Sequence, residues 1–90
     1  MNQDNVQARA ALGRVFLFAG QIDQASETVE PALAKHPDEP ELLAVRAAVR
    51  IRRGDVDGGT ADAERALKLD PKNENALALL ASVYSRQDGP

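Results

Sequence analysis

Two stretches of the chain, Ala32-Leu33-Ala34-Lys35-His36-Pro37 and Ala66-Leu67-Lys68-Leu69-Asp70-Pro71, align with each other when the residue numbers are shifted by 34. Gly20 and Gly54 keep the same spacing. A period of this length is typical of stacked helix hairpins, because a single hairpin cannot bury its apolar face without a neighbour. The repeat therefore predicts an all-α protein built from antiparallel helix hairpins.

Prolines, glycines and the spacing of apolar residues place the helix ends. Gly20 and Gly54 are typical helix stops, and the residues before Pro37 and Pro71 avoid the α region because of the proline ring. Asn73 is expected to cap the last helix, since its side chain can accept a backbone N–H. Five helices are predicted, joined by turns short enough to make consecutive helices antiparallel: 5–19, 23–35, 40–53, 57–69 and 74–87.

One helix start conflicts with helix propensity. Gly58 and Gly59 fall in the first turn of the predicted helix 57–69. Each glycine disfavours a helix by about 1 kcal/mol relative to alanine. This turn is therefore expected to fray.

Composition narrows the function classes. The chain has 90 residues, no cysteine and one histidine, His36, which has no second ligand at metal-binding spacing. No apolar run approaches the roughly 18–20 residues of a membrane span, and no catalytic motif is present. A net charge of −3 with only 3% aromatic residues disfavours nucleic-acid binding. We therefore predict a binding module that is not an enzyme, needs no cofactor or metal, and has neither nucleic acid nor membrane as its partner.

Further positions share one register between the copies. The first copy has Leu12-Gly13, Phe16, Gly20, Ala25, Ala32 and Pro37, and the second has Leu43, Ala47, Gly54, Ala66 and Pro71. This register resembles the tetratricopeptide repeat, a helix–turn–helix unit of the same period. The second copy departs from the family at Arg46 and Arg50, where leucine and tyrosine are preferred, and at Gly59, where alanine is preferred.

The resemblance covers nearly the whole chain, as repeat 1 (6–39), repeat 2 (40–73) and a half repeat or capping helix (74–90). It implies a short right-handed α-solenoid of five helices. It also implies that a protein or peptide partner binds the concave face, which the first helix of each pair lines.

The charges are distributed unevenly between the helices. The first helices of the three units, taken as 6–19, 40–53 and 74–87, hold seven arginines and two glutamates. The remaining residues hold four basic and twelve acidic side chains. A basic inner face would attract acidic partners, so an acidic peptide segment is the expected ligand. The residues that the family pattern places on this face and that we expect to contact it are Arg14, Phe18, Arg52, Arg86, Gln7 and Asn75; the alternative is an ordinary solvated helix face.

Three further arginines, Arg46, Arg50 and Arg53, lie in one stripe of the third helix because they are spaced by four and three residues. The family pattern would bury positions 46 and 50, and burying two unpaired guanidinium groups is unfavourable. Either the helix is rotated to present the stripe to solvent or a partner, or the arginines pair with acids. The candidate acids are Glu27, Glu30 and Asp62.

The last helix is richer in apolar residues than a solvent-facing cap requires. We therefore keep a second hypothesis, in which the chain is an assembly element or a fragment of a longer array and self-associates through this helix. The residues expected to make that contact are Leu77, Leu79, Val83 and Tyr84.

Overall fold

The computed structural model describes residues 5–87, and within them the chain forms five α-helices and no strand. The helices are α1 (Val6–Phe18), α2 (Ile22–Lys35), α3 (Pro40–Arg52), α4 (Val56–Leu69) and α5 (Glu74–Gln87). Each predicted helix is confirmed to within one residue at both ends. The last three residues of the predicted half repeat 74–90 lie outside the described residues.

The repeat period is visible in the helix starts and in the turns. α1, α3 and α5 begin at residues 6, 40 and 74, and α2 and α4 at residues 22 and 56. Gly20 and Gly54 have φ values of 78° and 92°, a left-handed conformation that glycine adopts without strain. After them, the N–H groups of Gln21 and Asp55 both donate to a carbonyl five residues back, at 2.8 Å. The two hairpins therefore close with the same Schellman turn.

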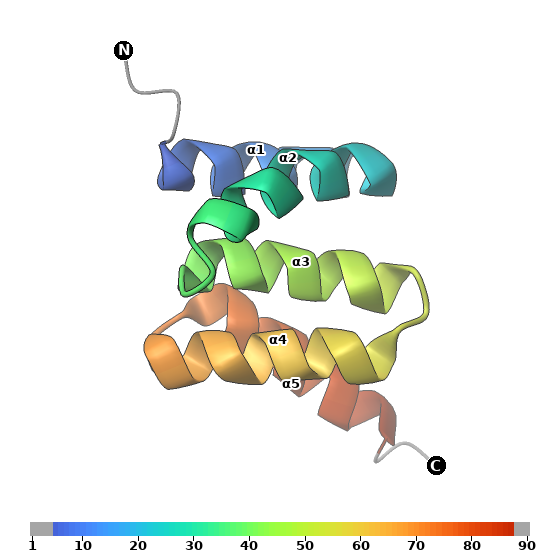
Figure 1. Cartoon of the computed structure of the whole chain (residues 1–90). Helices are drawn as coiled ribbons and strands as arrows, with labels where there is room; N and C mark the ends of the chain where they lie inside the picture. The colour runs from blue at the N-terminus through green and yellow to red at the C-terminus, as the bar shows by residue number, and fades with distance from the viewer. Residues whose placement is uncertain (1–4, 88–90) are drawn as a thin grey trace.

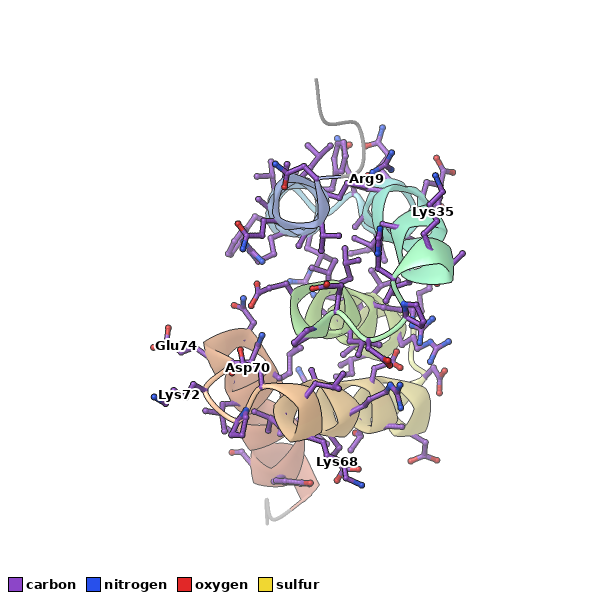
Figure 2. All side chains as sticks on the ribbon, turned by 60° about the vertical axis from the view of Figure 1, so that its left-hand side comes forward. Arg9, Lys35, Lys68, Asp70, Lys72 and Glu74 are labelled. Atoms are coloured by element: carbon purple, nitrogen blue, oxygen red, sulfur yellow. The ribbon has the colours of Figure 1, made fainter. Side chains whose placement is uncertain are left out.

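Helix α3 is the centre of the molecule. It packs against each of the other four helices, whereas α1 and α5, both described, make no contact with each other. Figure 1 shows α1 and α2 at one end of the stack, α3 in the middle, and α4 and α5 at the other end. In Figure 2, where α1 and α2 are seen nearly end-on, α1 and α5 lie on the same side of α3.

The core follows from the sequence of α3, which carries apolar residues on most of its circumference. Leu42, Leu43, Val45 and Val49 are fully buried, together with Val29 of α2. A helix with apolar residues on several faces must pack against more than one neighbour, which explains its central place. The architecture is an all-α helical repeat solenoid.

The first turn of α4 is formed and capped, so the expectation that it frays is wrong. The Asp55 carboxylate accepts a hydrogen bond from the Gly58 N–H at 2.9 Å. Gly59 is buried, and a Cβ at this position would lie 2.7 Å from the Ala47 carbonyl oxygen of α3. The glycine therefore allows α3 and α4 to approach closely, which a propensity argument cannot detect.

The cap of α5 is confirmed and carries a second function. Asn73 is buried, and its Oδ1 accepts the Ala76 N–H at 2.9 Å. Its Nδ2 donates to Glu41 of α3 at 2.6 Å, which ties the start of α5 to the central helix. Glu39 occupies the N-cap position of α3 without a side-chain cap bond.

None of the helices described between residues 5 and 87 is long and apolar enough to cross a bilayer.

Candidate functional site

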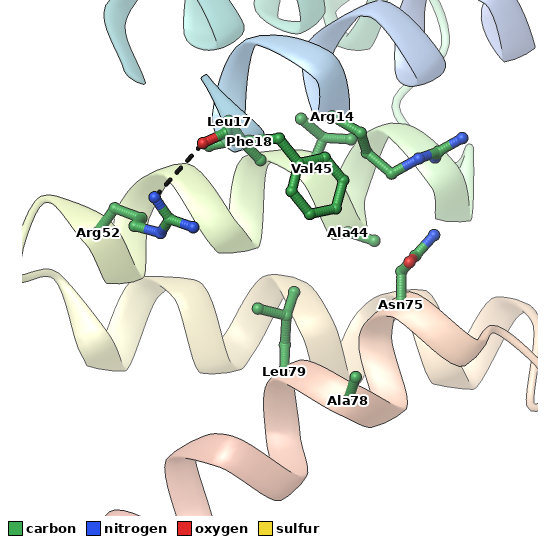
Figure 3. Close-up of a pocket in the computed structure, with 9 residues that line it drawn as sticks. All are labelled: Arg14, Leu17, Phe18, Ala44, Val45, Arg52, Asn75, Ala78 and Leu79. Atoms are coloured by element: carbon green, nitrogen blue, oxygen red, sulfur yellow. Dashed lines mark hydrogen bonds between the residues drawn. The ribbon is translucent and has the colours of Figure 1, made fainter. Parts of the chain in front are cut away.

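A groove runs between α1 and α5, with α3 as its floor. It exists because α1 and α5 both pack on α3 but do not contact each other. The groove encloses about 320 Å³. Figure 3 shows the Phe18 ring over the groove, with Arg52 on one side of it and Arg14 on the other. The lining residues are Arg14, Leu17, Phe18, Ala44, Val45, Arg52, Asn75, Ala78 and Leu79.

The groove brings together four of the six residues that the sequence singles out for partner contact. Arg14, Phe18, Arg52 and Asn75 line it, whereas Gln7 and Arg86 are exposed but lie outside the lining. The five other lining residues, Leu17, Ala44, Val45, Ala78 and Leu79, are not among these six. Val45 and Leu79 are one repeat period apart, as are Ala44 and Ala78, so the repeat register relates the two members of each pair once one of them is placed.

The charge of Arg14 is offset inside the protein. Its Nη1 donates to the Glu41 carboxylate at 2.9 Å. Glu41 also accepts hydrogen bonds from Asn73 and, at 3.5 Å, from the Asn75 amide. This end of the groove is therefore a satisfied polar cluster with little net charge.

The other end of the groove keeps an uncompensated positive charge. Arg52 Nη1 donates to the Leu17 carbonyl oxygen at 3.5 Å, as drawn in Figure 3. Within residues 5–87, neither Arg52 nor Arg86 has a carboxylate within ion-pair distance. Phe18, the last residue of α1, is 89% exposed, an unusual state for a large aromatic side chain.

The arginine stripe on α3 is used for structure, so the hypothesis of pairing with acids is confirmed. Asp62 of α4 is 5% exposed and accepts from Arg46 Nε at 2.9 Å, from Arg46 Nη2 at 3.0 Å and from Arg50 Nη1 at 3.0 Å. Arg46 also reaches Glu30 of α2 at 3.4 Å. Hydrogen bonding to Asp62 raises the pKa of Arg46 above its usual value, against the opposing effect of partial burial. Through these contacts, the arginine side chains of α3 connect it to both α2 and α4.

Two other arginines of the first helices are also engaged. Arg53 pairs with Asp23 of α2, a partner that the sequence argument did not name. Arg9 of α1, labelled in Figure 2, donates to the Thr28 carbonyl oxygen of α2 at 3.3 Å and does not line the groove. The predicted basic face is therefore reduced to Arg52 and Arg86, because four of the other arginines pair with carboxylates and Arg9 turns towards α2.

Helix α5 exposes part of its apolar surface. Leu77 and Tyr84 are about half exposed, and Ala81 lies between them at helical spacing. Val83 is only 3% exposed and belongs to the core, so its assignment to an exposed contact face is wrong. Tyr84 Oη donates to Glu64 of α4 at 3.1 Å, and this hydrogen bond raises the pKa of the phenol.

No cluster of three or more histidine or acidic side chains that could hold a metal ion occurs within the described part of the chain. His36 is the C-cap residue of α2, where its backbone N–H donates to the Ala32 carbonyl oxygen. The groove and the open face of α5 are surface features that could accommodate a partner.

Comparison with known proteins agrees with this architecture. A family model for the tetratricopeptide repeat matches residues 1–49. A pentatricopeptide repeat-containing protein of Arabidopsis thaliana is 34% identical over an alignment of 79 residues, and the alignment covers 84% of this chain and 9% of the relative. The chain thus spans about a tenth of the length of that protein. No solved structure matches this chain. Together with the regular recurrence of the helix hairpins, the matching family model shows that this chain belongs to the tetratricopeptide repeat family.

Proposed function

We propose that the groove between α1 and α5 binds an acidic peptide segment of a partner protein. Repeats of this family generally mediate protein–protein interactions and are typically not enzymes. The observation that carries the proposal is Arg52, an exposed cation in the groove lining that has no carboxylate partner among the described residues. Arg86, which lies outside the lining, is a second exposed cation without such a partner.

The surroundings of Arg52 suit a peptide ligand. A guanidinium group offers five N–H donors in a planar fork that matches a carboxylate, and Arg52 uses one of its nitrogens on the Leu17 carbonyl. The adjacent Phe18 and Leu79 offer apolar surface at the same site. A ligand that carries a carboxylate next to an apolar side chain would therefore satisfy both features.

Replacing Arg52 with glutamate is expected to weaken binding of an acidic peptide by about 10- to 100-fold, because a charge-assisted hydrogen bond contributes about 1.5–3 kcal/mol. Fluorescence anisotropy with pools of labelled acidic and basic peptides at low salt would measure the affinity. Binding should weaken as salt rises, because counter-ions screen exposed charges.

The matched control is Arg65→Glu on α4, which changes the net charge equally but lies outside the groove. It should leave the affinity within about twofold of the unaltered protein, given the screening of distant surface charges. Equal affinity for the acidic and basic pools, or equal losses in the two variants, would contradict the proposal.

A second candidate function is assembly through α5, favoured by its open stripe of Leu77, Ala81 and Tyr84. The equivalent residues of α3 are Leu43, Ala47 and Arg50. Ala47 is fully buried, and its carbonyl oxygen lies against Gly59 of α4. The corresponding face of α5 has no such helix over it within the described residues, so a helix from another chain could pack there.

For this second candidate we expect the mass from light scattering to rise with protein concentration and Leu77→Glu to abolish the rise. Leu77 is the better probe than Leu79, because Leu79 lines the groove and packs against the core. The control is Ser82→Glu, since Ser82 is exposed and lies on a different face of α5 from the stripe. A constant monomer mass over the whole concentration range would rule this candidate out.

A further inference from the structure

An apolar face is open on α1 as well as on α5, and Figure 1 shows these two helices at opposite ends of the stack. The α5 face is the stripe of Leu77, Ala81 and Tyr84. The exposed residues that share one side of α1, here called the α1 face, are Ala8, Ala11, Leu12 and Val15. Leu12 and Val15 are 47% and 59% exposed, so this face is as open as the stripe.

The repeat register shows that the α1 face belongs to a kind of surface that other helices cover. The α3 residues one period after Ala8, Ala11 and Val15 are Leu42, Val45 and Val49, and all three are fully buried. The α5 residues two periods after Ala8, Leu12 and Val15 are Ala76, Leu80 and Val83, and they are buried as well. Val45 lies against the preceding hairpin, because a Cβ at Gly13 of α1 would be 2.9 Å from its Cγ1. The α1 face thus continues the interface that joins the hairpins.

The stripe on α5 is also a surface that another helix covers elsewhere in the molecule. Ala81 is equivalent to Gly13 of α1 and Ala47 of α3, which both lie where a second helix comes close. Val29 of α2 lies next to Gly13, and Gly59 of α4 lies next to Ala47. Helix α5 therefore has a small residue where a close helix contact is made, although no helix covers the stripe within residues 5–87.

The α1 face has the residue spacing of the helices that cover such a stripe. The buried residues of the two covering helices, spaced by four and three, are Ala25, Val29 and Ala32 on α2 and Gly59, Ala63 and Ala66 on α4. Ala8, Leu12 and Val15 have the same spacing on α1. A helix with this pattern presents one continuous apolar side to its neighbour, so α1 can cover the stripe of another copy.

Charges beside the two faces are complementary. Lys68 lies one turn of α4 from Glu64, whose carboxylate contacts the stripe, and Glu74 lies one turn before the stripe on α5. Glu27 and Arg9 line the hollow beside the α1 face. Lys68, Glu74, Glu27 and Arg9 make no ion pair within the described part of the chain. Contact between the stripe and the α1 face therefore offers each of these four charges a partner of opposite sign.

We propose that copies of this protein associate head to tail, with the stripe of one copy covered by the α1 face of the next. This inference rests on the second candidate function, assembly through α5, and specifies the surface that α5 contacts. Because the two faces differ, every added copy leaves one of each open, and the assembly does not close at a dimer. A two-fold contact through α5 alone would leave the α1 face uncovered.

Two variants that each block one face test the proposal. Leu77→Glu blocks the stripe and Val15→Glu blocks the α1 face, and both side chains are exposed enough for the fold to tolerate the change. In sedimentation velocity, each variant alone should remain a monomer at all concentrations. An equimolar mixture should form a complex of two chains and no larger species, because each variant contributes its one intact face. The unaltered protein should exceed the mass of two chains as its concentration rises.

The controls carry the same change in net charge outside the two faces. Gln7→Glu on α1 and Ser82→Glu on α5 replace exposed residues on other sides of their helices. Both controls should assemble as the unaltered protein does. Circular dichroism would confirm that all four variants keep their helices.

The outcomes separate this inference from the assembly function on which it rests. If Val15→Glu still self-associates while Leu77→Glu does not, α5 mediates assembly without the α1 face, and the head-to-tail contact is wrong. A mixture of the two variants that stays monomeric also overturns it. If the unaltered protein is a monomer at every concentration, both the inference and the assembly function fail.

Discussion

Replacing Arg46 with methionine is expected to lower the free energy of unfolding by about 2–4 kcal/mol, because the buried carboxylate of Asp62 would lose two of its three hydrogen bonds. Removing one partner of a buried ion pair typically costs about 3–5 kcal/mol. We expect somewhat less here, since the Arg46 side chain is 23% exposed and Arg50 would still reach Asp62. Urea unfolding followed by far-ultraviolet circular dichroism would measure the change.

The control for this prediction is Arg53→Met. Arg53 also belongs to the arginine stripe, but its partner Asp23 is largely exposed, and such surface pairs contribute about 0–1 kcal/mol. Combining Arg46→Met with Asp62→Leu should recover much of the lost stability, because no carboxylate then remains buried. Equal losses for the Arg46 and Arg53 variants would show that Asp62 does not depend on Arg46.

Replacing Gly59 with alanine is expected to destabilise the protein by up to about 2 kcal/mol, because overpacking outweighs the gain that helix propensity predicts. The new Cβ would lie 2.5 Å from Ile51 Cγ1 and 2.7 Å from the Ala47 carbonyl oxygen. Overpacking of this kind lowers the free energy of unfolding by about 1–3 kcal/mol, and the higher helix propensity of alanine raises it by about 1 kcal/mol. The Ile51 side chain can shift, but the backbone carbonyl of α3 cannot move without displacing the helix.

The neighbouring glycine provides the matched control for this second prediction. A Cβ at Gly58 would meet only the Asp55 side chain, which can rotate away at the loss of the cap bond. That loss is about 1 kcal/mol, similar to the propensity gain, so Gly58→Ala should be nearly neutral. Thermal and urea unfolding of both variants would compare them, and a stabilised Gly59→Ala protein would contradict the close packing of α3 on α4.

The candidate site could be predicted in part. The resemblance to the repeat family assigns Arg14, Phe18, Arg52 and Asn75 to one surface, because equivalent positions in stacked hairpins face the same way. The repeat register does not determine which arginine side chains remain without a carboxylate partner. Glu41 lies close enough to Arg14 to offset its charge, and this pairing depends on how α1 sits on α3. The same limit applies to Val83, whose burial depends on how α5 rests on its neighbours.

The sequence by itself determined the helices, their order and their period, because these depend on local signals: apolar spacing, the prolines after α2 and α4, and glycines at the two left-handed turns. The tertiary structure alone decided what the unusual residues of the second repeat do. Asp62 lies 12 to 16 residues from Arg50 and Arg46 in the chain, and only the packing of α4 on α3 brings its carboxylate within 3.0 Å of both. That same packing makes Gly59 a contact residue rather than a weak point in a helix. These effects depend on how closely two helices approach each other, which no pattern of residue types specifies.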